Sequence, residues 1–214
     1  MKLLPFSHFG PSVEAGVLQV QKDVLDVLPF PVQWLNQVHG TRIVEIASMG
    51  EPQEADAMVS RTPGVRLLIK TADCIPVVFA DEEAGLVAAV HAGWRGLTAD
   101  IVPLTIARLV AMGASVERLK VGVGPSLGVE CAEFSDPLVE IPAKYHWAVR
   151  EKKLSERTAR VVDLCAILER QLADAGVASD RVEWMRVCTC CSPEWFSWRR
   201  DKVMKRFGTF IALR

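Results

Sequence analysis

The sequence predicts an α/β (α+β) fold, a sandwich of mixed sheets flanked by helices and built as one domain over residues 1–214. Three observations support this prediction. Half of the 214 residues are apolar, which suffices to bury a sizeable core. Short apolar or alternating runs, bounded by Gly, Pro or charged residues, recur along the chain. Only two stretches combine helical periodicity with signals for a helix start and stop.

Each element is predicted from its local pattern. A helix is expected over 96–114, with Thr98 as its N-cap and Gly113 as its C-terminal stop. A second helix is expected over 161–176, because its leucines and isoleucine recur on one face. The charged segment 140–160 is expected to be a surface excursion. Strands are expected at 42–47, 57–60, 65–70, 75–80, 86–91, 119–123, 182–187 and 209–213.

The composition excludes several classes of protein. The formal net charge is −1, so no basic excess indicates nucleic-acid binding. No apolar run approaches the roughly 20 residues that a membrane-spanning helix needs. Pro5 interrupts the short apolar patch at the N-terminus and no cleavage site follows, so a cytoplasmic protein is expected. Six cysteines in such a protein indicate metal binding, reactivity or burial rather than a disulfide framework.

Cys74 and His91 stand at corresponding points of two consecutive apolar runs. If the acidic turn 81–85 joins these runs as antiparallel strands, the two side chains meet at one end of the sheet. His39 precedes a glycine at the entrance to another strand, where a side chain can face a cleft. Imidazole and thiolate are ligands of zinc, so the three residues are candidate metal ligands. Cys74 as a nucleophile with His91 as its base, or simple packing, remain alternatives.

Other motifs offer donors for a substrate. Trp94 and Arg95 lie on a glycine-flanked turn before the first predicted helix, where backbone N–H groups and a guanidinium can bind an anion. The segment 121–128, which contains Ser126, is a strand followed by a tight Gly-Pro-Ser turn.

The segment 188–201 combines cysteines with aromatic and basic residues. A zinc knuckle built on Cys188, Cys190 and Cys191 is disfavoured, because adjacent cysteines rarely bind one ion and no second pair has zinc-finger spacing. The remaining residues could form an aromatic wall with cationic donors for a planar or anionic substrate, or simply pack. They are Trp195, Phe196, Trp198, Arg199 and Arg200.

Several motifs in one order give the chain a family resemblance. They are "NQVHG", "DAMVS", "KTADCIPVVFAD", "VAAVHAGWRG", "GVGPSLG", "CT…FSWRRD" and "GTFIAL". From about Trp34 to Arg214 the chain resembles the YfiH-type family, also called the laccase-domain, multicopper polyphenol oxidase or purine nucleoside phosphorylase family.

The resemblance implies a YfiH-like sandwich with a zinc or copper ion held by His39, Cys74 and His91. It implies phosphorolysis of adenosine, inosine and methylthioadenosine, with adenosine deaminase and polyphenol oxidase activities. The partners would be a nucleoside and phosphate, bound by a monomer or homodimer. Arg95, Arg199 and Arg200 are the expected phosphate donors, Trp94, Trp195 or Phe196 would stack on the base, and Ser126 lies in the substrate loop.

The chain also departs from the family pattern. Residues 1–33 resemble a shortened N-terminal segment, and Cys131 stands where a tyrosine often follows the Gly-Pro loop. Two other functions therefore stay open. One is a cysteine hydrolase or amidase in peptidoglycan editing, with Cys74 as nucleophile and His91 as base. The other is a binding protein with a degenerate site.

Overall fold

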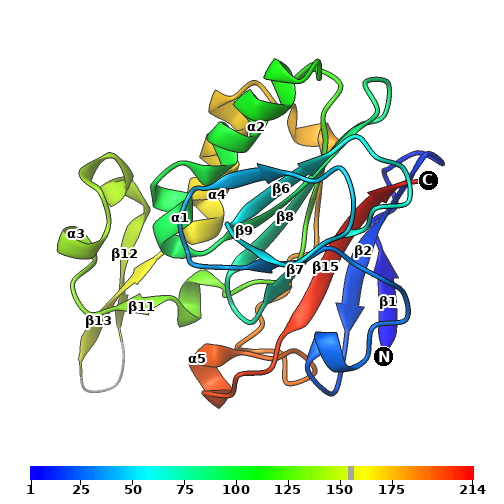
Figure 1. Cartoon of the computed structure of the whole chain (residues 1–214). Coiled ribbons are helices and arrows are strands. Elements are labelled where there is room, and N and C mark those ends of the chain that lie inside the picture. Colours follow the sequence, from blue (N-terminus) through cyan, green and yellow to red (C-terminus); the bar gives the residue numbers. More distant parts are fainter. Residues whose placement is uncertain (154–156) are drawn as a thin grey trace.

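The computed structural model describes residues 1–153 and 157–214. Its central layer is a six-stranded sheet, with helices on one face and a four-stranded sheet on the other (Figure 1). The six strands in spatial order are β14 (Val182–Trp184), β10 (Lys120–Val123), β8 (Ile75–Asp81), β9 (Leu86–Ala92), β6 (Ala57–Ser60) and β4 (Ile43–Glu45). The layers confirm the predicted sandwich.

Strands β8 and β9 form the middle of this sheet, and every residue of both is buried. Successive side chains of a strand point to opposite faces. Val77 and Phe79 therefore join the core beneath the helices, while Val78 and Ala80 join the core facing the second sheet. Burial on both faces explains why these two strands read as continuous apolar runs in the sequence.

The four-stranded sheet contains the first and the last strand of the chain (Figure 1). Its strands in spatial order are β1 (Lys2–Pro5), β2 (Val13–Gln19), β15 (Phe207–Leu213) and β7 (Leu67–Thr71). β2 pairs antiparallel with β1 on one side and with β15 on the other. The segment 1–33 therefore supplies two strands that the sequence patterns did not predict.

The first predicted helix is divided in two. α1 (Trp94–Thr98) and α2 (Ile101–Ala111) are separated by Asp100, whose backbone is left-handed with φ 68°. Its carboxylate accepts hydrogen bonds from Tyr145 Oη at 2.5 Å and Gln171 Nε2 at 3.2 Å. The predicted N-cap Thr98 is wrong, because its hydroxyl donates back to the Trp94 carbonyl inside α1.

The second predicted helix is confirmed as α4 (Leu164–Asp174), whose N-cap Asp163 accepts from the Ala166 amide at 3.0 Å. The segment expected to be a surface excursion instead contributes buried residues to the core, among them Ile141, Tyr145 and Ala148. Its residues 154–156 lie outside the described part of the chain.

Short elements complete the fold. A small sheet contains β11 (Glu133–Phe134), β13 (Thr158–Val162) and β12 (Val149–Lys153), and β3 (Leu35–Asn36) pairs with β5 (Gln53–Glu54). Short helices are α3 (Pro137–Glu140), α5 (Trp198–Asp201) and the 3₁₀ turns Val24–Asp26, Val129–Cys131, Ala143–Ala148 and Ser179–Arg181. Within the described ranges, none of the helices has the length and apolar character to cross a bilayer.

The helical layer gives the first prediction. Leu109 of α2 is fully buried against the six-stranded sheet, whereas Leu104 of the same helix is 46 % exposed. Leu109→Ala should lower the free energy of unfolding by about 2–5 kcal/mol. Leu104→Ala should change it by about 0.5 kcal/mol. Urea unfolding followed by circular dichroism measures both, and equal losses would contradict this packing.

Candidate metal centre

His39, Cys74 and His91 converge at one end of the six-stranded sheet. The antiparallel pairing of β8 and β9 places Pro76 opposite His91. Cys74 immediately precedes β8 and therefore lies beside the end of β9. One ligand atom from each of the three side chains lies within 4.8 Å of the others. Cys74 Sγ is 3.9 Å from His39 Nε2, and the two imidazole rings lie edge to face with centroids 4.8 Å apart.

The three side chains differ in exposure. His91 is buried, Cys74 is half-buried and His39 is exposed. The cluster is therefore closed on the side of the sheet and open to solvent beside His39. A ligand could reach the centre from that side.

Asp56 organises this cluster from behind. It lies directly before β6, and its carboxylate is fully buried. Oδ1 contacts His91 Nδ1 at 2.7 Å and accepts from the His39 amide at 2.9 Å. Oδ2 accepts from the Gly40 amide at 2.7 Å and from the Val38 amide at 3.3 Å. One carboxylate thus orients the His91 ring, with Nε2 toward the cluster, and holds the loop that carries His39.

The loop bearing His39 has a strained backbone. His39 has φ 62°, a left-handed conformation that costs a non-glycine residue free energy. Beside it, a Cβ atom added to Gly96 would lie only 2.7 Å from the Gly40 carbonyl oxygen. The close approach of this loop to α1 therefore requires glycine at position 96. The hydrogen bonds to Asp56 offset the strain at His39.

Gly93 forms the floor of the cluster. A Cβ atom placed on it would lie 2.7 Å from His39 Cδ2, and 3.4 Å from both Cys74 Sγ and His91 Cε1. Only a residue without a side chain allows the three ligands to come this close. Tetrahedral zinc with ordinary Zn–S and Zn–N bonds would separate sulfur and nitrogen by about 3.6 Å, close to the 3.9 Å between Cys74 and His39. The residues present fit a single zinc or copper ion.

The charges of the cluster also suit a cation. Burial raises the pKa of the Cys74 thiol, but contacts with His39 and His91 lower it to about 6. Burial lowers the pKa of His91, but its hydrogen bonds with Asp56 and Cys74 raise it to about 9. Burial raises the pKa of Asp56, but His91 and the Gly40 amide hold it below its ordinary value. These contacts favour the thiolate form of Cys74, which is the form that binds a metal ion.

Asp73 connects the cluster to the C-terminal motif. Its backbone is left-handed, with φ 93°. Its carboxylate accepts from Thr189 Oγ1 at 2.7 Å and from the Arg199 amide at 2.6 Å. Its carbonyl accepts from the Leu127 amide at 2.8 Å. Two loops far apart in the sequence therefore hold the residue that precedes Cys74.

Trp94 and Arg95 follow Gly93 directly and lie beside the cluster. The Arg95 guanidinium carbon stacks over the Trp94 ring at 4.2 Å, and Phe134 meets that ring edge-on at 5.5 Å. In the described ranges, the exposed Arg95 side chain forms no hydrogen bond or ion pair. Arg199 extends one donor to the Glu133 carbonyl at 2.9 Å. These two arginines are the expected anion donors that remain available.

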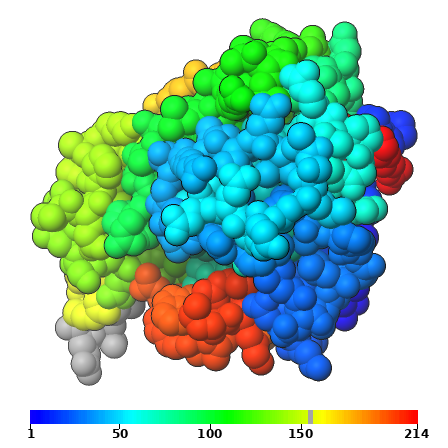
Figure 2. Space-filling view, viewed as in Figure 1, coloured from blue at the N-terminus to red at the C-terminus, as the bar shows by residue number. Residues whose placement is uncertain are grey.

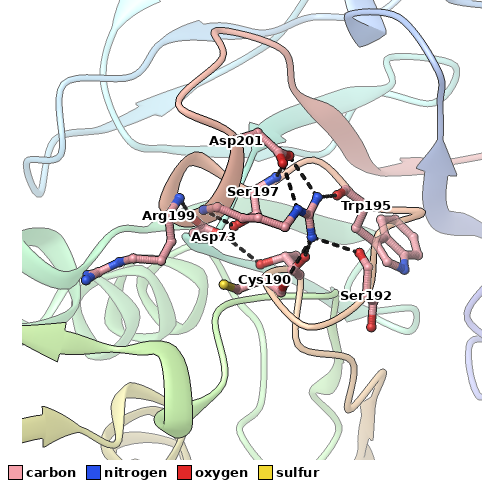
Figure 3. Close-up of polar contacts among 9 residues, drawn as sticks. Asp73, Cys190, Ser192, Trp195, Ser197, Arg199 and Asp201 are labelled. Atoms are coloured by element: carbon pink, nitrogen blue, oxygen red, sulfur yellow. Dashed lines mark hydrogen bonds and ion pairs between the residues drawn. The ribbon is translucent and has the colours of Figure 1, made fainter. Parts of the chain in front are cut away.

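Arg200 has a different role. Its guanidinium donates to the carbonyls of Thr189 and Cys190 at 2.7 and 3.0 Å, to that of Ser192 at 3.2 Å and to that of Trp195 at 2.6 Å. It also pairs with Asp201 at 2.7 Å. In Figure 3 these contacts fan out from one guanidinium to the loop and the Asp201 carboxylate. Arg200 is therefore a clamp on the loop 189–195, with its donors occupied.

Ser126 and Trp195 also lie elsewhere than expected. Ser126 is buried, and its hydroxyl faces Cys165 Sγ at 3.7 Å. Trp195 is buried in the core, edge-on to Phe207 with centroids 4.9 Å apart. Phe196 lines a separate hollow of about 350 Å³ with Trp195 and Lys205. The structure does not bring these residues to the metal cluster.

The surface is indented where three segments of the chain meet. Figure 2 shows this hollow between the blue and cyan first third of the chain, the green middle segment and the orange segment near the C-terminus. These segments carry His39, Trp94 and Arg199, respectively.

Comparisons with known proteins agree with this architecture. A family profile described as multi-copper polyphenol oxidoreductase laccase matches residues 10–214, which extends the resemblance into the N-terminal segment. A purine nucleoside phosphorylase of Deinococcus radiodurans is 37% identical over 168 residues, covering 78% of this chain and 64% of that protein. One from Streptomyces coelicolor is 34% identical over 193 residues, covering 88% and 78%. This chain thus spans less than two thirds of the Deinococcus protein.

Solved structures share the fold. Neisseria meningitidis protein NMB0706 matches with a TM-score of 0.83 and 25% identity, covering 99% of this chain and 98% of that one. YlmD from Geobacillus stearothermophilus matches with a TM-score of 0.80 and 24% identity, covering 95% and 93%. The likeness confirms the predicted fold class over nearly the whole chain.

The close packing of the three ligands against Gly93 gives a second prediction. Gly93→Ala places a Cβ 2.7 Å from the His39 ring, so one ligand must move away. We expect zinc affinity at this centre to fall by roughly 10- to 100-fold, as when a metal ligand loses its outer support. Competition with a chromophoric chelator measures the affinity, and Cys74→Ser, titrated in parallel, identifies the zinc that belongs to this centre.

Gly50→Ala is the matched control, because a Cβ there meets nothing within 4 Å. This control should bind zinc like the unchanged protein. Equal zinc affinity at the centre in both glycine variants would contradict the requirement for glycine at position 93.

Proposed function

The chain belongs to the YfiH-type laccase-domain family, and on that premise we propose that it is a metal-dependent purine nucleoside phosphorylase. The observation that carries the proposal is the convergence of His39, Cys74 and His91 within 4.8 Å, in front of a buried carboxylate. The proposed substrates are adenosine, inosine and methylthioadenosine. Adenosine deamination and phenol oxidation are proposed as secondary activities of the same centre.

His39 Nε2, Cys74 Sγ and His91 Nε2 would hold one zinc or copper ion and leave a coordination position open. When bound, such an ion supplies Lewis acidity, which polarises an oxygen or nitrogen of the substrate and lowers the pKa of a bound water. The donor set of two nitrogens and one sulfur accepts both metals, so the donors alone do not select between zinc and copper. Asp56 keeps the His91 ring oriented for binding, because its carboxylate occupies Nδ1.

Phosphorolysis exchanges one bond at the sugar for another. A phosphate oxygen forms a bond to C1′ of the ribose as the C1′–N9 bond breaks. The proton that the hydrogen phosphate loses ends on a nitrogen of the released purine. The negative charge of phosphate requires nearby cations. We propose that Arg95 and Arg199 bind it, since Arg95 is exposed two residues after Gly93, and the exposed Arg199 is tied through its amide to Asp73, the residue before Cys74.

Trp94 would act through Arg95 rather than by stacking on the base. The guanidinium covers one face of the indole at 4.2 Å, and Phe134 supports the ring edge-on. Such stacking fixes the plane of the guanidinium while leaving its N–H groups directed outward.

The partners that we propose are a nucleoside and phosphate, bound by a cytoplasmic monomer or homodimer.

Product analysis tests the proposal. The protein, with its metal content determined on the same sample, is incubated with adenosine, inosine or methylthioadenosine, with and without phosphate. Chromatography should show release of adenine or hypoxanthine only with phosphate. Cys74→Ser, purified identically, should lose this activity, which excludes a contaminating phosphorylase.

Arg95→Gln should raise the KM for phosphate by roughly 10- to 100-fold, the loss expected for a hydrogen bond to a charged group. Arg108→Gln is the control, because Arg108 is an exposed arginine paired with Glu45. Absence of base release from all three nucleosides by the metal-loaded protein would refute the phosphorylase proposal. Cleavage of a cell-wall amide by strictly metal-free protein would instead favour the amidase alternative, and its loss in Cys74→Ser would identify Cys74 as the nucleophile.

A further inference from the structure

A second cluster of thiols lies apart from the first centre. Cys131 follows the loop after β10, and Cys188 and Cys191 lie in the loop after β14. Their sulfur atoms all lie within 4.8 Å of one another, with Cys131 and Cys191 at 3.4 Å. The sequence disfavoured a metal here because it offered no second pair, but the fold supplies Cys131 from 57 to 60 residues away. Cys188 and Cys191 also have the spacing of a Cys-x-x-Cys ligand pair.

The backbone around Cys188 is arranged for a thiolate. The Gly128 amide donates to Cys188 Sγ at 3.2 Å, and the Ser192 amide donates to the Cys188 carbonyl at 3.1 Å, which closes the turn. Burial raises the pKa of Cys188, but the amides of Gly128, Cys191 and Cys190 lower it below its ordinary value. Several N–H groups directed at one sulfur stabilise its anion, as they do for a metal-bound thiolate.

Nearby cations and hydrogen bonds hold the cluster in place. Arg200 binds the carbonyls of Cys190 and Ser192 in the same loop, as Figure 3 shows. Lys152 donates to the Glu130 carbonyl at 2.7 Å, next to Cys131. These contacts hold the main chain beside both halves of the cluster. The loop geometry is therefore fixed without any bound ion.

We propose that Cys131, Cys188 and Cys191 form a second metal site, for a thiophilic closed-shell ion such as Zn²⁺ or Cu⁺. Binding would release the thiol protons to solvent. Sulfur ligands about 2.3 Å from one ion lie about 3.8 Å apart, within the spread of the separations here. Cys190 lies between two of the ligands in the same turn and could occupy a fourth position, which water would otherwise fill.

The site would strengthen the frame of the first centre. An ion held by Cys131 and Cys188 joins the loop after β10 to the loop after β14. Leu127 of one loop and Thr189 of the other both hydrogen-bond Asp73, the residue before Cys74. The second ion is therefore structural in this proposal, and its binding does not depend on catalysis at the first centre.

The test starts from the double variant His39→Asn/Cys74→Ser, which removes ligands of the first centre. Asparagine tolerates the left-handed backbone at position 39. Under anaerobic reducing conditions, this protein should retain one equivalent of zinc, or of Cu⁺ when copper is supplied in that state. Its cobalt derivative should show an intense thiolate-to-cobalt charge-transfer band.

Adding Cys188→Ser should abolish both the retained ion and the band. Cys165→Ser is the matched control, because Cys165 is a thiol outside the cluster that faces Ser126. The Cys165→Ser change should leave the retained ion and the charge-transfer band unchanged. Circular dichroism of each metal-free variant confirms that the protein folds.

The proposal is overturned if the folded double variant binds no thiophilic ion, or if adding Cys188→Ser leaves binding unchanged. It is also overturned if mass spectrometry of the reduced, metal-supplied protein shows a Cys131–Cys191 disulfide. A band that survives Cys188→Ser and disappears in Cys165→Ser would place the ion elsewhere.

Discussion

The candidate metal centre depends on the hydrogen bonds made by the buried carboxylate of Asp56. An uncompensated charge inside a protein is costly, and removing one partner of a buried pair costs about 3–5 kcal/mol. The charge of Asp56 is compensated by the His91 ring at one oxygen and by backbone amides of residues 38–40 at both oxygens. The contacts that compensate the carboxylate charge therefore also position the two histidine ligands.

The rest of the structure brings this carboxylate and its partners together. β6 pairs antiparallel with β9, which places Asp56 beside His91, and β9 pairs with β8, which leads back to Cys74. Gly93 and Gly96 then allow α1 to lie against the His39 loop without side chains between them. The sheet fixes two ligands, and the loop held by Asp56 adds the third.

Sequence patterns predicted the sheet well where periodicity is local. β8 and β9 are long apolar runs joined by a tight turn, so their pairing and the proximity of Cys74 and His91 followed from spacing. The break at Asp100 was not visible, because the contacts that hold its left-handed backbone come from Tyr145 and Gln171, far along the chain. The helical periodicity of the surrounding residues gives no sign of a break at one residue.

The missed site residues share the same cause. Asp56 stood inside the "DAMVS" motif, yet a lone aspartate before a strand gives no sign that it will be buried beneath a histidine. Arg200 resembled a substrate donor in the sequence, but in the folded loop its guanidinium donates to main-chain carbonyls and pairs with Asp201. Cys131 joined Cys188 and Cys191 through tertiary contact alone. Spacing predicts neighbours along a hairpin, not convergence of distant loops.

Anomalous diffraction at the metal absorption edge tests the central claim most directly. Crystals of the protein prepared with zinc should show an anomalous peak in contact with His39 Nε2, Cys74 Sγ and His91 Nε2, at about 2.0–2.3 Å from each. The same experiment on Cys74→Ser should show the peak weakened or lost at that position. A fully zinc-supplied crystal with no peak among these three side chains would contradict the account.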